Sequence, residues 1–210
     1  MCLALLFYFL TAGLTGCGAS NTPGVTRLPA AADLPADYTQ YTDSGFGFRI
    51  SFPKQWGTMS ITRKLQETAR ESIPKVNAGQ SISPLSVMSI CPKSLVGTDS
   101  YHLPWLSITI RNASPKTASA AEVAATHTVY MRSLMGDYDE LSSNVTVIDG
   151  LDAMVLEYHH ADGTLDAHTL MLITVRNGYI WEIQATSEVD KYEDWEADFH
   201  TILQSFSFLK

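Results

Sequence analysis

Residues 166–186, DAHTLMLITVRNGYIWEIQAT, decide the fold of this chain. Two long apolar runs flank Asn177-Gly178, and Asn-Gly is the strongest short signal for a two-residue hairpin turn. Apolar residues lie on both faces of the first run, with Leu172 on one and Ile173 on the other. A strand that is apolar on both faces is covered on both sides. The sequence therefore predicts an antiparallel hairpin inside a sheet that has cover on both faces.

Further strands lie on the amino-terminal side of this hairpin. Alternating or apolar runs predict them at Phe46–Phe52, Thr58–Thr62, Leu85–Ile90, Trp105–Arg111 and Val145–Ile148 with its continuation Ala153–His159. Asp162-Gly163 is expected to turn the last of these into the strand that starts at Asp166. Residues 63–83 are polar and are interpreted as an excursion from the core, with a short helix before Pro74.

Two helices complete the pattern. Ser119 and Glu122 form a capping box, and Gly136 is expected to end the helix that follows. Its apolar stripe, predicted to face the core, consists of Val123, His127, Tyr130, Met131 and Leu134. The second helix, capped by Asp190 and Glu193, has the stripe Tyr192, Trp195, Phe199, Ile202 and Leu203. The order of elements predicts an α+β fold, a largely antiparallel sheet sandwiched by helices.

The start of the chain carries a second signal. Residues 3–10 are almost wholly apolar, and Leu14-Thr15-Gly16-Cys17 follows them. The run is too short for a membrane span, which needs about 20 residues, but has the length of a signal-peptide core. Because no Lys or Arg precedes Arg27, we expect the true start to lie upstream of Met1. The alternative is a short hydrophobic helix with an incidental cysteine.

This segment resembles the lipobox of bacterial lipoproteins. The resemblance implies a signal peptide over 1–16, lipid on Cys17 (palmitate among its chains) and a protein anchored in the cell envelope, at the outer membrane or the outer face of the cytoplasmic membrane. Residues 17–37, rich in Ala, Pro, Thr, Ser and Gly, are expected to form a flexible tether in the periplasm or its equivalent. The folded domain is then 38–210.

Composition excludes several classes of function. The net charge of −8 argues against binding nucleic acid. Cys2 and Cys17 would be removed or lipidated, so only Cys91 is left, and it is interpreted as a packed small hydrophobe. No nucleophile, metalloprotease, phosphate-loop or paired-cysteine motif occurs, so the protein is not expected to be an enzyme.

Two segments of the domain carry a family resemblance. They are Tyr41 through Phe48–Pro53 to Trp56, an aromatic strand that runs into Pro-x-x-Trp, and Phe199–Phe206, a last helix that runs into Ser-Phe. Together with the late hairpins they make 38–210 similar to the PsbP-like proteins. The resemblance implies an antiparallel sheet sandwiched by helices and a role in assembly, docking or accessory binding. The group shares no active-site motif, so it implies no functional residue.

One cluster could bind a metal. If Asp162-Gly163 is the turn, His159 lies opposite Asp166 and Glu157 opposite His168, and all four side chains share one face. Imidazole and carboxylate are ligands for zinc or another transition metal. The alternative is a solvated hairpin end with acid–histidine pairs across the strands.

The favoured function is therefore a non-catalytic, lipid-anchored envelope protein that binds or helps to assemble a partner protein. The alternative is a lipoprotein that binds a metal or small ligand on the 157–168 hairpin face. A hydrolase without a recognisable motif is a third interpretation.

Overall fold

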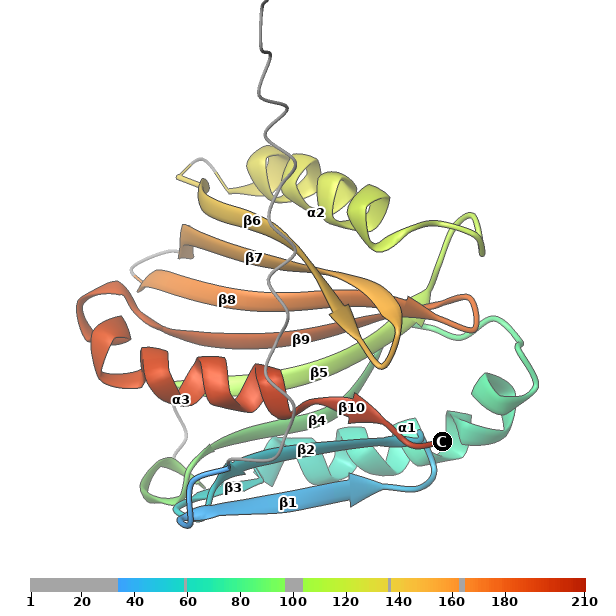
Figure 1. Cartoon of the computed structure of the whole chain (residues 1–210), viewed down its shortest axis with the longest axis horizontal. Helices are drawn as coiled ribbons and strands as arrows, with labels where there is room; N and C mark the ends of the chain where they lie inside the picture. Colours follow the sequence, from blue (N-terminus) through green and yellow to red (C-terminus); the bar gives the residue numbers. More distant parts are fainter. Residues whose placement is uncertain (1–33, 59, 97–103, 136, 163–164) are drawn as a thin grey trace, which may run out of the picture.

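The computed structural model describes residues 34–58, 60–96, 104–135, 137–162 and 165–210. These residues form an α+β domain with two antiparallel sheets and three α-helices (Figure 1). The large sheet has the order β3-β4-β5-β9-β8-β7-β6, and the small sheet has the order β1-β2-β10. The strands are β1 (Tyr38–Asp43), β2 (Phe48–Pro53), β3 (Trp56–Thr58), β4 (Leu85–Pro92), β5 (Trp105–Asn112), β6 (Asp139–Ile148), β7 (Leu151–Asp162), β8 (Leu165–Arg176), β9 (Tyr179–Glu188) and β10 (Ser207–Phe208). The helices are α1 (Ser60–Asn77), α2 (Ala120–Leu134) and α3 (Tyr192–Ser205).

The predicted Asn-Gly hairpin is confirmed as the pair β8–β9. Asn177 has φ 55° and Gly178 has φ 78°, the two positive values that a type I′ turn requires. The register runs from Arg176 opposite Tyr179 back to Ala167 opposite Glu188. The two strands lie inside the large sheet, between β5 and β7.

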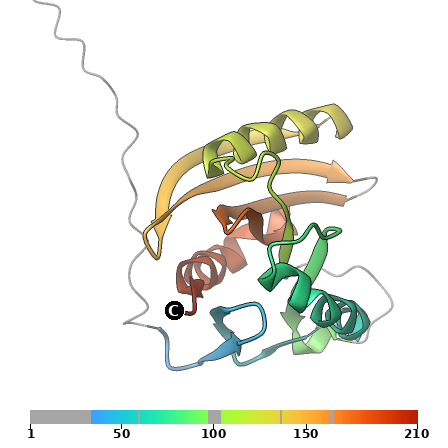
Figure 2. The same cartoon turned by 90° about the vertical axis from the view of Figure 1, so that its right-hand side faces the viewer.

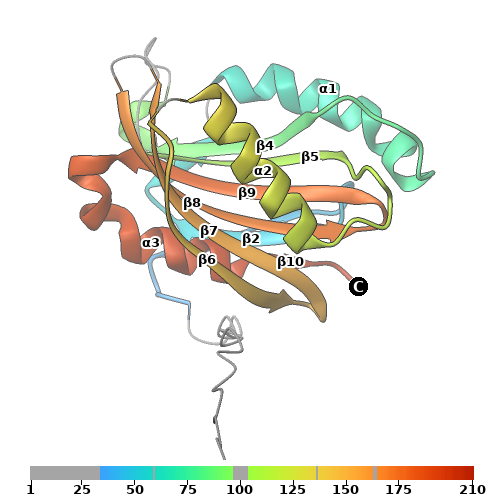
Figure 3. The ribbon, with the colours of Figure 1, turned by 90° about the horizontal axis from the view of Figure 1, so that it is seen from above.

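Both faces of the large sheet are covered, as the apolar pattern predicts. Figures 2 and 3 show α2 on one side and α3 with the small sheet on the other. Leu170, Leu172 and Ile183 belong to the cluster that α3 and the small sheet cover. Met171 and Ile173 belong to the cluster under α2. The alternation of neighbouring side chains thus divides the core into two layers.

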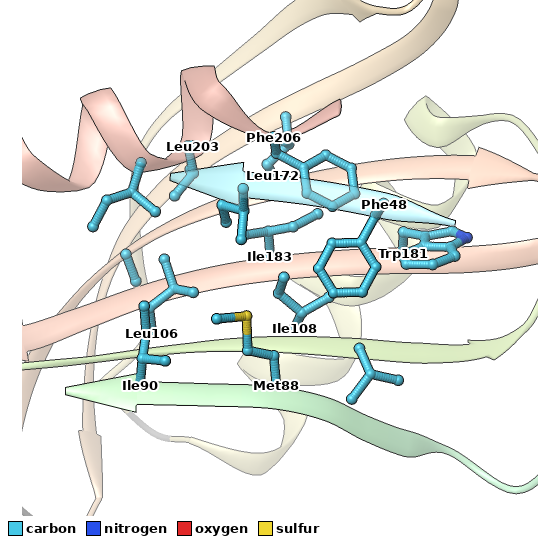
Figure 4. Packing of buried hydrophobic residues seen from close by; sticks show 14 of the residues in the cluster. Phe48, Met88, Ile90, Leu106, Ile108, Leu172, Trp181, Ile183, Leu203 and Phe206 are labelled. Carbon is cyan, nitrogen blue, oxygen red and sulfur yellow. The ribbon is translucent and has the colours of Figure 1, made fainter. Parts of the chain in front are cut away.

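The larger core layer lies between the two sheets (Figure 4). Phe48 on β2 is fully buried, and its ring centroid is 5.8 Å from that of Trp181 on β9 and 5.9 Å from that of Phe206. Burying a large apolar side chain contributes about 1.5–3 kcal/mol. These rings therefore attach the small sheet to the large one.

The small sheet joins segments far apart in the sequence. β2 pairs with β1 along one edge and with β10 along the other. Beside this sheet, the backbone N–H of Ser51 donates to the hydroxyl of Ser205 at the end of α3, over 2.8 Å. Tyr38 on β1 donates its hydroxyl hydrogen to the carboxylate of Asp198 on α3. The helix and the small sheet are thus one packed unit.

The apolar stripe of the last helix is confirmed, but its predicted caps are wrong. Phe199, Ile202 and Leu203 are buried against the sheets. The helix begins after Lys191, and no side chain caps it. A 3₁₀ turn over Val189–Lys191 leads directly into α3, and the backbone N–H of Tyr192 donates within that turn. An Asp or Glu cap is therefore not used.

Three other expectations differ from the structure. Val145–Ile148 and Ala153–His159 belong to two antiparallel strands, β6 and β7, because Asp149 (φ 49°) and Gly150 (φ 81°) form a turn between them. The helix expected before Pro74 is present but longer than predicted, because α1 begins at Ser60, has 18 residues and continues past Pro74, so the polar segment 63–83 lies largely in it. The expected strand Thr58–Thr62 is replaced by β3 and the start of this helix. α1 packs on β4, and its Ile73 and Val76 contact the larger core layer.

Candidate functional site

The four predicted hairpin residues lie on the β7–β8 hairpin, in a register that differs from the expected one. β7 ends at Asp162 and β8 begins at Leu165, so His159 lies opposite His168, Glu157 opposite Leu170 and Asp166 opposite Ala161. The turn is centred one residue later than expected, and each pairing is displaced by two residues. Because side chains alternate with period two, the four residues still share one face.

Three of these side chains form a hydrogen-bonded chain. Nε2 of His168 lies 2.9 Å from Oε1 of Glu157, and Nδ1 of His168 lies 3.0 Å from Nε2 of His159. A carboxylate only accepts, so Nε2 of His168 carries a hydrogen and donates to Glu157. In neutral His168, Nδ1 then accepts from Nε2–H of His159. Ser142 on β6 donates to the other oxygen of Glu157, over 3.3 Å.

The start of α3 covers this chain of side chains. The ring of Tyr192 stacks on the ring of His168, with centroids 3.3 Å apart and planes 7° apart. His168 is 7% exposed and Tyr192 is 5% exposed. Burial lowers the pKa of His168, the hydrogen bond to Glu157 opposes that shift, and the positive charge that His159 can carry lowers the pKa further. Neutral His168 is the favoured form.

The side chains of Glu157, His168 and His159 are arranged to hydrogen-bond to one another and not to converge on a common metal ion. Both ring nitrogens of His168 are engaged in hydrogen bonds, and Asp166, opposite Ala161, lies two residue pairs closer to the turn than the His159–His168 pair. A zinc site needs three or four ligand atoms at about 2.0–2.2 Å from one point. Within the described ranges, no group of three or more His, Cys, Asp or Glu side chains is arranged to hold a metal ion. Zinc binding at Glu157, His159, Asp166 and His168 stays a prediction, and this arrangement does not favour it.

A surface that the sequence did not predict lies on α2. The capping box of Ser119 and Glu122 is confirmed, and Val123 is buried as expected. The rest of the predicted stripe is partly wrong, because Tyr130 is 58% exposed and Leu134 is 59% exposed. The core-facing side of the helix runs instead through Ala120, Val123, Ala124 and Thr128. Small residues on that side let α2 lie close to the sheet.

We call the exposed side of α2 the α2 surface, defined by Val129, Tyr130 and Leu134. Val129 is 68% exposed. Residues four apart on a helix are neighbours, so Tyr130 and Leu134 adjoin each other, whereas Val129 lies about 100° around the helix from Tyr130. The single apolar residues of an ordinary surface need no explanation, but three large exposed ones on the outer side of one helix indicate a contact surface.

A hollow of about 340 Å³ lies where the β8–β9 turn meets the loop before β2. Its cation, Arg176, donates to the carbonyl oxygens of Gly47 and Leu209 and lies over the ring of Phe208, 4.3 Å from its centroid. These contacts fasten the end of the chain to β8. The guanidinium has a structural role here.

The cysteines divide between the described and undescribed parts. Cys17, with the predicted signal peptide and most of the tether, lies outside the described residues. Cys91 is 1% exposed, and burial raises the pKa of its thiol, which fits the predicted packing role. Within the part of the chain that the structure describes, no helix has the length and apolarity to cross a membrane.

Comparison with known proteins supports the fold. No family model matches the sequence. No curated protein matches it significantly. The structure is similar to the solution structure of cyanobacterial PsbP (CyanoP) from Synechocystis, with a TM-score of 0.55 and 17% identity over 84% of this chain and 95% of that chain. The fold is therefore PsbP-like.

Two other solved structures are more distantly similar. LpqN of Mycobacterium tuberculosis, described as involved in cell envelope biogenesis, has a TM-score of 0.47 and 10% identity over 87% of this chain and 89% of that chain. PA94 of Pseudomonas aeruginosa, described as a putative regulator of unknown function, has a TM-score of 0.44 and 12% identity over 80% of this chain and 94% of that chain.

Proposed function

We propose that this protein is a lipid-anchored envelope protein whose PsbP-like domain binds or helps to assemble a partner protein, without catalysing a reaction. The lipobox pattern at Leu14–Cys17 supports the anchor, and the polar, small-residue composition of 17–37 supports a tether. The α2 surface is the observation that carries the binding role. A tethered domain that exposes large apolar residues on one helix is suited to docking against another protein.

The α2 surface has the composition of an interface anchor. Tyrosine is enriched at the energetic centres of protein interfaces because its large ring carries a polar tip. Tyr130 adjoins Leu134, and polar Thr126 and Ser133 lie between this pair and Val129 on the same side of the helix. Large apolar side chains interspersed with small polar ones are compatible with a docking surface that is also soluble when free.

The hydrogen-bonded chain at the hairpin supports a non-catalytic role. A hydrolytic triad needs a nucleophile that donates to the imidazole, with the carboxylate behind it. Here the hydroxyl of Ser142 donates to Glu157 itself. The ring of Tyr192 covers His168. The arrangement therefore holds α3 against the hairpin and presents no activated nucleophile.

Anchoring is tested by labelling cells with a palmitate analogue. We expect the wild-type protein to be labelled and a Cys17→Ala variant to be unlabelled and released from membranes. Labelling of the variant would contradict the anchor. A Cys91→Ala variant is the matched control and should be labelled like the wild type.

Partner binding is tested by site-specific photo-crosslinking in cells of the source organism. A photoreactive residue at Tyr130 or Leu134 should form a discrete adduct of constant mass. The same residue at exposed Ala121, on the first turn of α2, is the control and should not. Adducts of equal yield at all three positions, or none at any, would contradict a partner docked on the α2 surface.

A further inference from the structure

β6 is a long, open edge of the large sheet. It lies at one end of the strand order and spans ten residues, whereas the strand at the other end, β3, spans three. Among the described residues, β6 is paired only with β7. An edge of this length presents a row of backbone donors and acceptors to any extended chain that approaches.

The register shows which backbone groups face outward. Ile148 and Leu151 close the two-residue turn, and they exchange hydrogen bonds as such closing pairs do. Hydrogen-bonded and non-hydrogen-bonded pairs alternate along an antiparallel ladder. The N–H and C=O groups of Ser143, Val145 and Val147 therefore point away from β7, and an added strand would pair with them.

The usual protection of an edge strand is weak here. Proteins guard open edges with lysine, proline or a bulge. β6 contains neither lysine nor proline. Its one irregularity lies between Glu140 and Ser142, so the ladder is regular from Ser142 to Ile148. The outward-facing backbone groups of Ser143, Val145 and Val147 all lie on this regular part.

The charge and the side chains of this edge define its partner. Residues 137–152 contain five acidic residues and no Lys or Arg; the acids are Asp137, Asp139, Glu140, Asp149 and Asp152. Val147 is 39% exposed, and Val145 packs against the apolar cluster under α2. A segment that alternates apolar and basic side chains complements both properties.

The start of β6 lies beside helix α2. The hydroxyl of Thr128 on α2 donates to the carboxylate of Glu140 on β6, over 2.7 Å. The guanidinium carbon of Arg132 lies 5.8 Å from the ring centroid of Tyr138, the residue before β6. A partner docked on α2 is thus within reach of the edge.

We propose that the partner adds an extended, basic segment to β6 as an eighth strand of the large sheet. This inference rests on the proposed partner-binding function and names the chemistry of that partner. Backbone hydrogen bonds to β6 would supply affinity, and the acidic residues at both ends of the strand would select the charge.

The test uses two fluorescent nine-residue peptides, one alternating valine with lysine and one alternating valine with glutamate. Binding to residues 18–210 is measured by anisotropy at low and high salt. We expect the lysine peptide to bind, the glutamate peptide to bind at least tenfold more weakly, and salt to weaken the first. Ser143→Pro removes an outward N–H while leaving the bonds to β7, and should weaken binding at least tenfold. Ser143→Thr keeps the N–H and should bind like the wild type.

Folding of each variant is checked by thermal melting, and amide exchange gives an independent readout. The lysine peptide should slow exchange at Ser143, Val145 and Val147. Equal binding to wild type and Ser143→Pro, or no slowing at these amides, would overturn the edge proposal. If photo-crosslinks at Leu134 persist in that case, partner binding stands without the edge. If those crosslinks are absent but peptide binding still requires the Ser143 N–H, docking on the α2 surface is contradicted and strand addition to β6 is supported.

Discussion

The hydrogen-bonded chain Glu157–His168–His159 makes the stability of this domain sensitive to acid, and single substitutions should weaken or strengthen that sensitivity. Two nitrogens that face each other at 3.0 Å share one hydrogen. One added proton is accommodated, because His168 then donates from both nitrogens. A second proton places two N–H groups against each other and costs the hydrogen bond.

The size of the repulsion follows from the geometry. The ring centroids of His159 and His168 lie 4.4 Å apart. Two unit charges at about 4 Å repel by about 4 kcal/mol at an effective dielectric constant of about 20. The carboxylate of Glu157 offsets part of this repulsion, and the carboxylate of Glu196 on α3 acts in the same direction.

The sign of the pH effect follows from the lowered pKa of His168. Below the ordinary pKa of about 6.5 the unfolded chain binds a proton that the folded chain resists. The free energy of unfolding therefore has its full value above that pH. It decreases as the pH falls through the folded-state pKa, and each such histidine contributes a slope of at most about 1.4 kcal/mol per pH unit. His127 is on α2, and burial also lowers its pKa, so it adds a slope of the same sign.

Two variants distinguish the pH dependence that comes from the hairpin from the contribution of His127. His159→Gln removes a charge that lowers the pKa of His168, so the loss of stability on acidification should decrease. Glu157→Gln removes the group that raises this pKa, so the loss should begin at the same pH and extend further. Both leave the contribution of His127 unchanged.

The assay is urea unfolding of residues 18–210 at intervals between pH 5 and pH 8, followed by tryptophan fluorescence. The expected order of pH dependence is Glu157→Gln, wild type, His159→Gln, from steepest to flattest. Three parallel curves would refute the reasoning, since they would show that no coupled proton resides at this hairpin. Chemical shifts of the His168 ring provide the same order by an independent route.

Three further outcomes are expected. Leu172→Ala, at a fully buried position between Val155 and Ile183, should lower the free energy of unfolding by about 3–5 kcal/mol in urea titration, and a loss under about 1 kcal/mol would contradict the described core. Ser205→Ala leaves a buried backbone N–H without its acceptor and should cost about 1–3 kcal/mol in the same titration, whereas Ser205→Thr, which keeps the hydroxyl, isolates the packing contribution. Cys91 should resist a thiol reagent in native protein and react fully in denaturant, and rapid native labelling would show that β4 is not buried as described.

Much of the architecture follows from local sequence signals. The Asn177-Gly178 turn, the capping box at Ser119 and the apolar stripe of the last helix each involve residues close in sequence, so local chemistry specifies them. Asp149-Gly150 carries the same hairpin signal, but the short runs beside it resemble one interrupted strand. α1 is longer than its sequence predicts, because Pro74 argues for an end of the helix that packing on β4 and on the larger core layer overrides.

The candidate site shows the limit of pattern reasoning more sharply. Side chains alternate between the two faces of a strand, so a register displaced by two residues still leaves Glu157, His159 and His168 on one face. Which residue lies opposite each of them depends on the centre of the turn, and moving that centre by one residue changes every pair. The stacking of Tyr192 joins elements that no local pattern relates. The exposure of Tyr130 and Leu134 depends on the rotation of α2, which helical spacing alone does not fix.

The small sheet also sets the order of events during folding. β1 opens the domain, β10 is its last strand, and both pair with β2. A nascent chain therefore cannot complete this sheet until Ser207 and Phe208 have left the ribosome. Until then β2 lacks its partner on one side, and the small sheet stays incomplete. A truncation before Ser207 should arrest the chain in that open state.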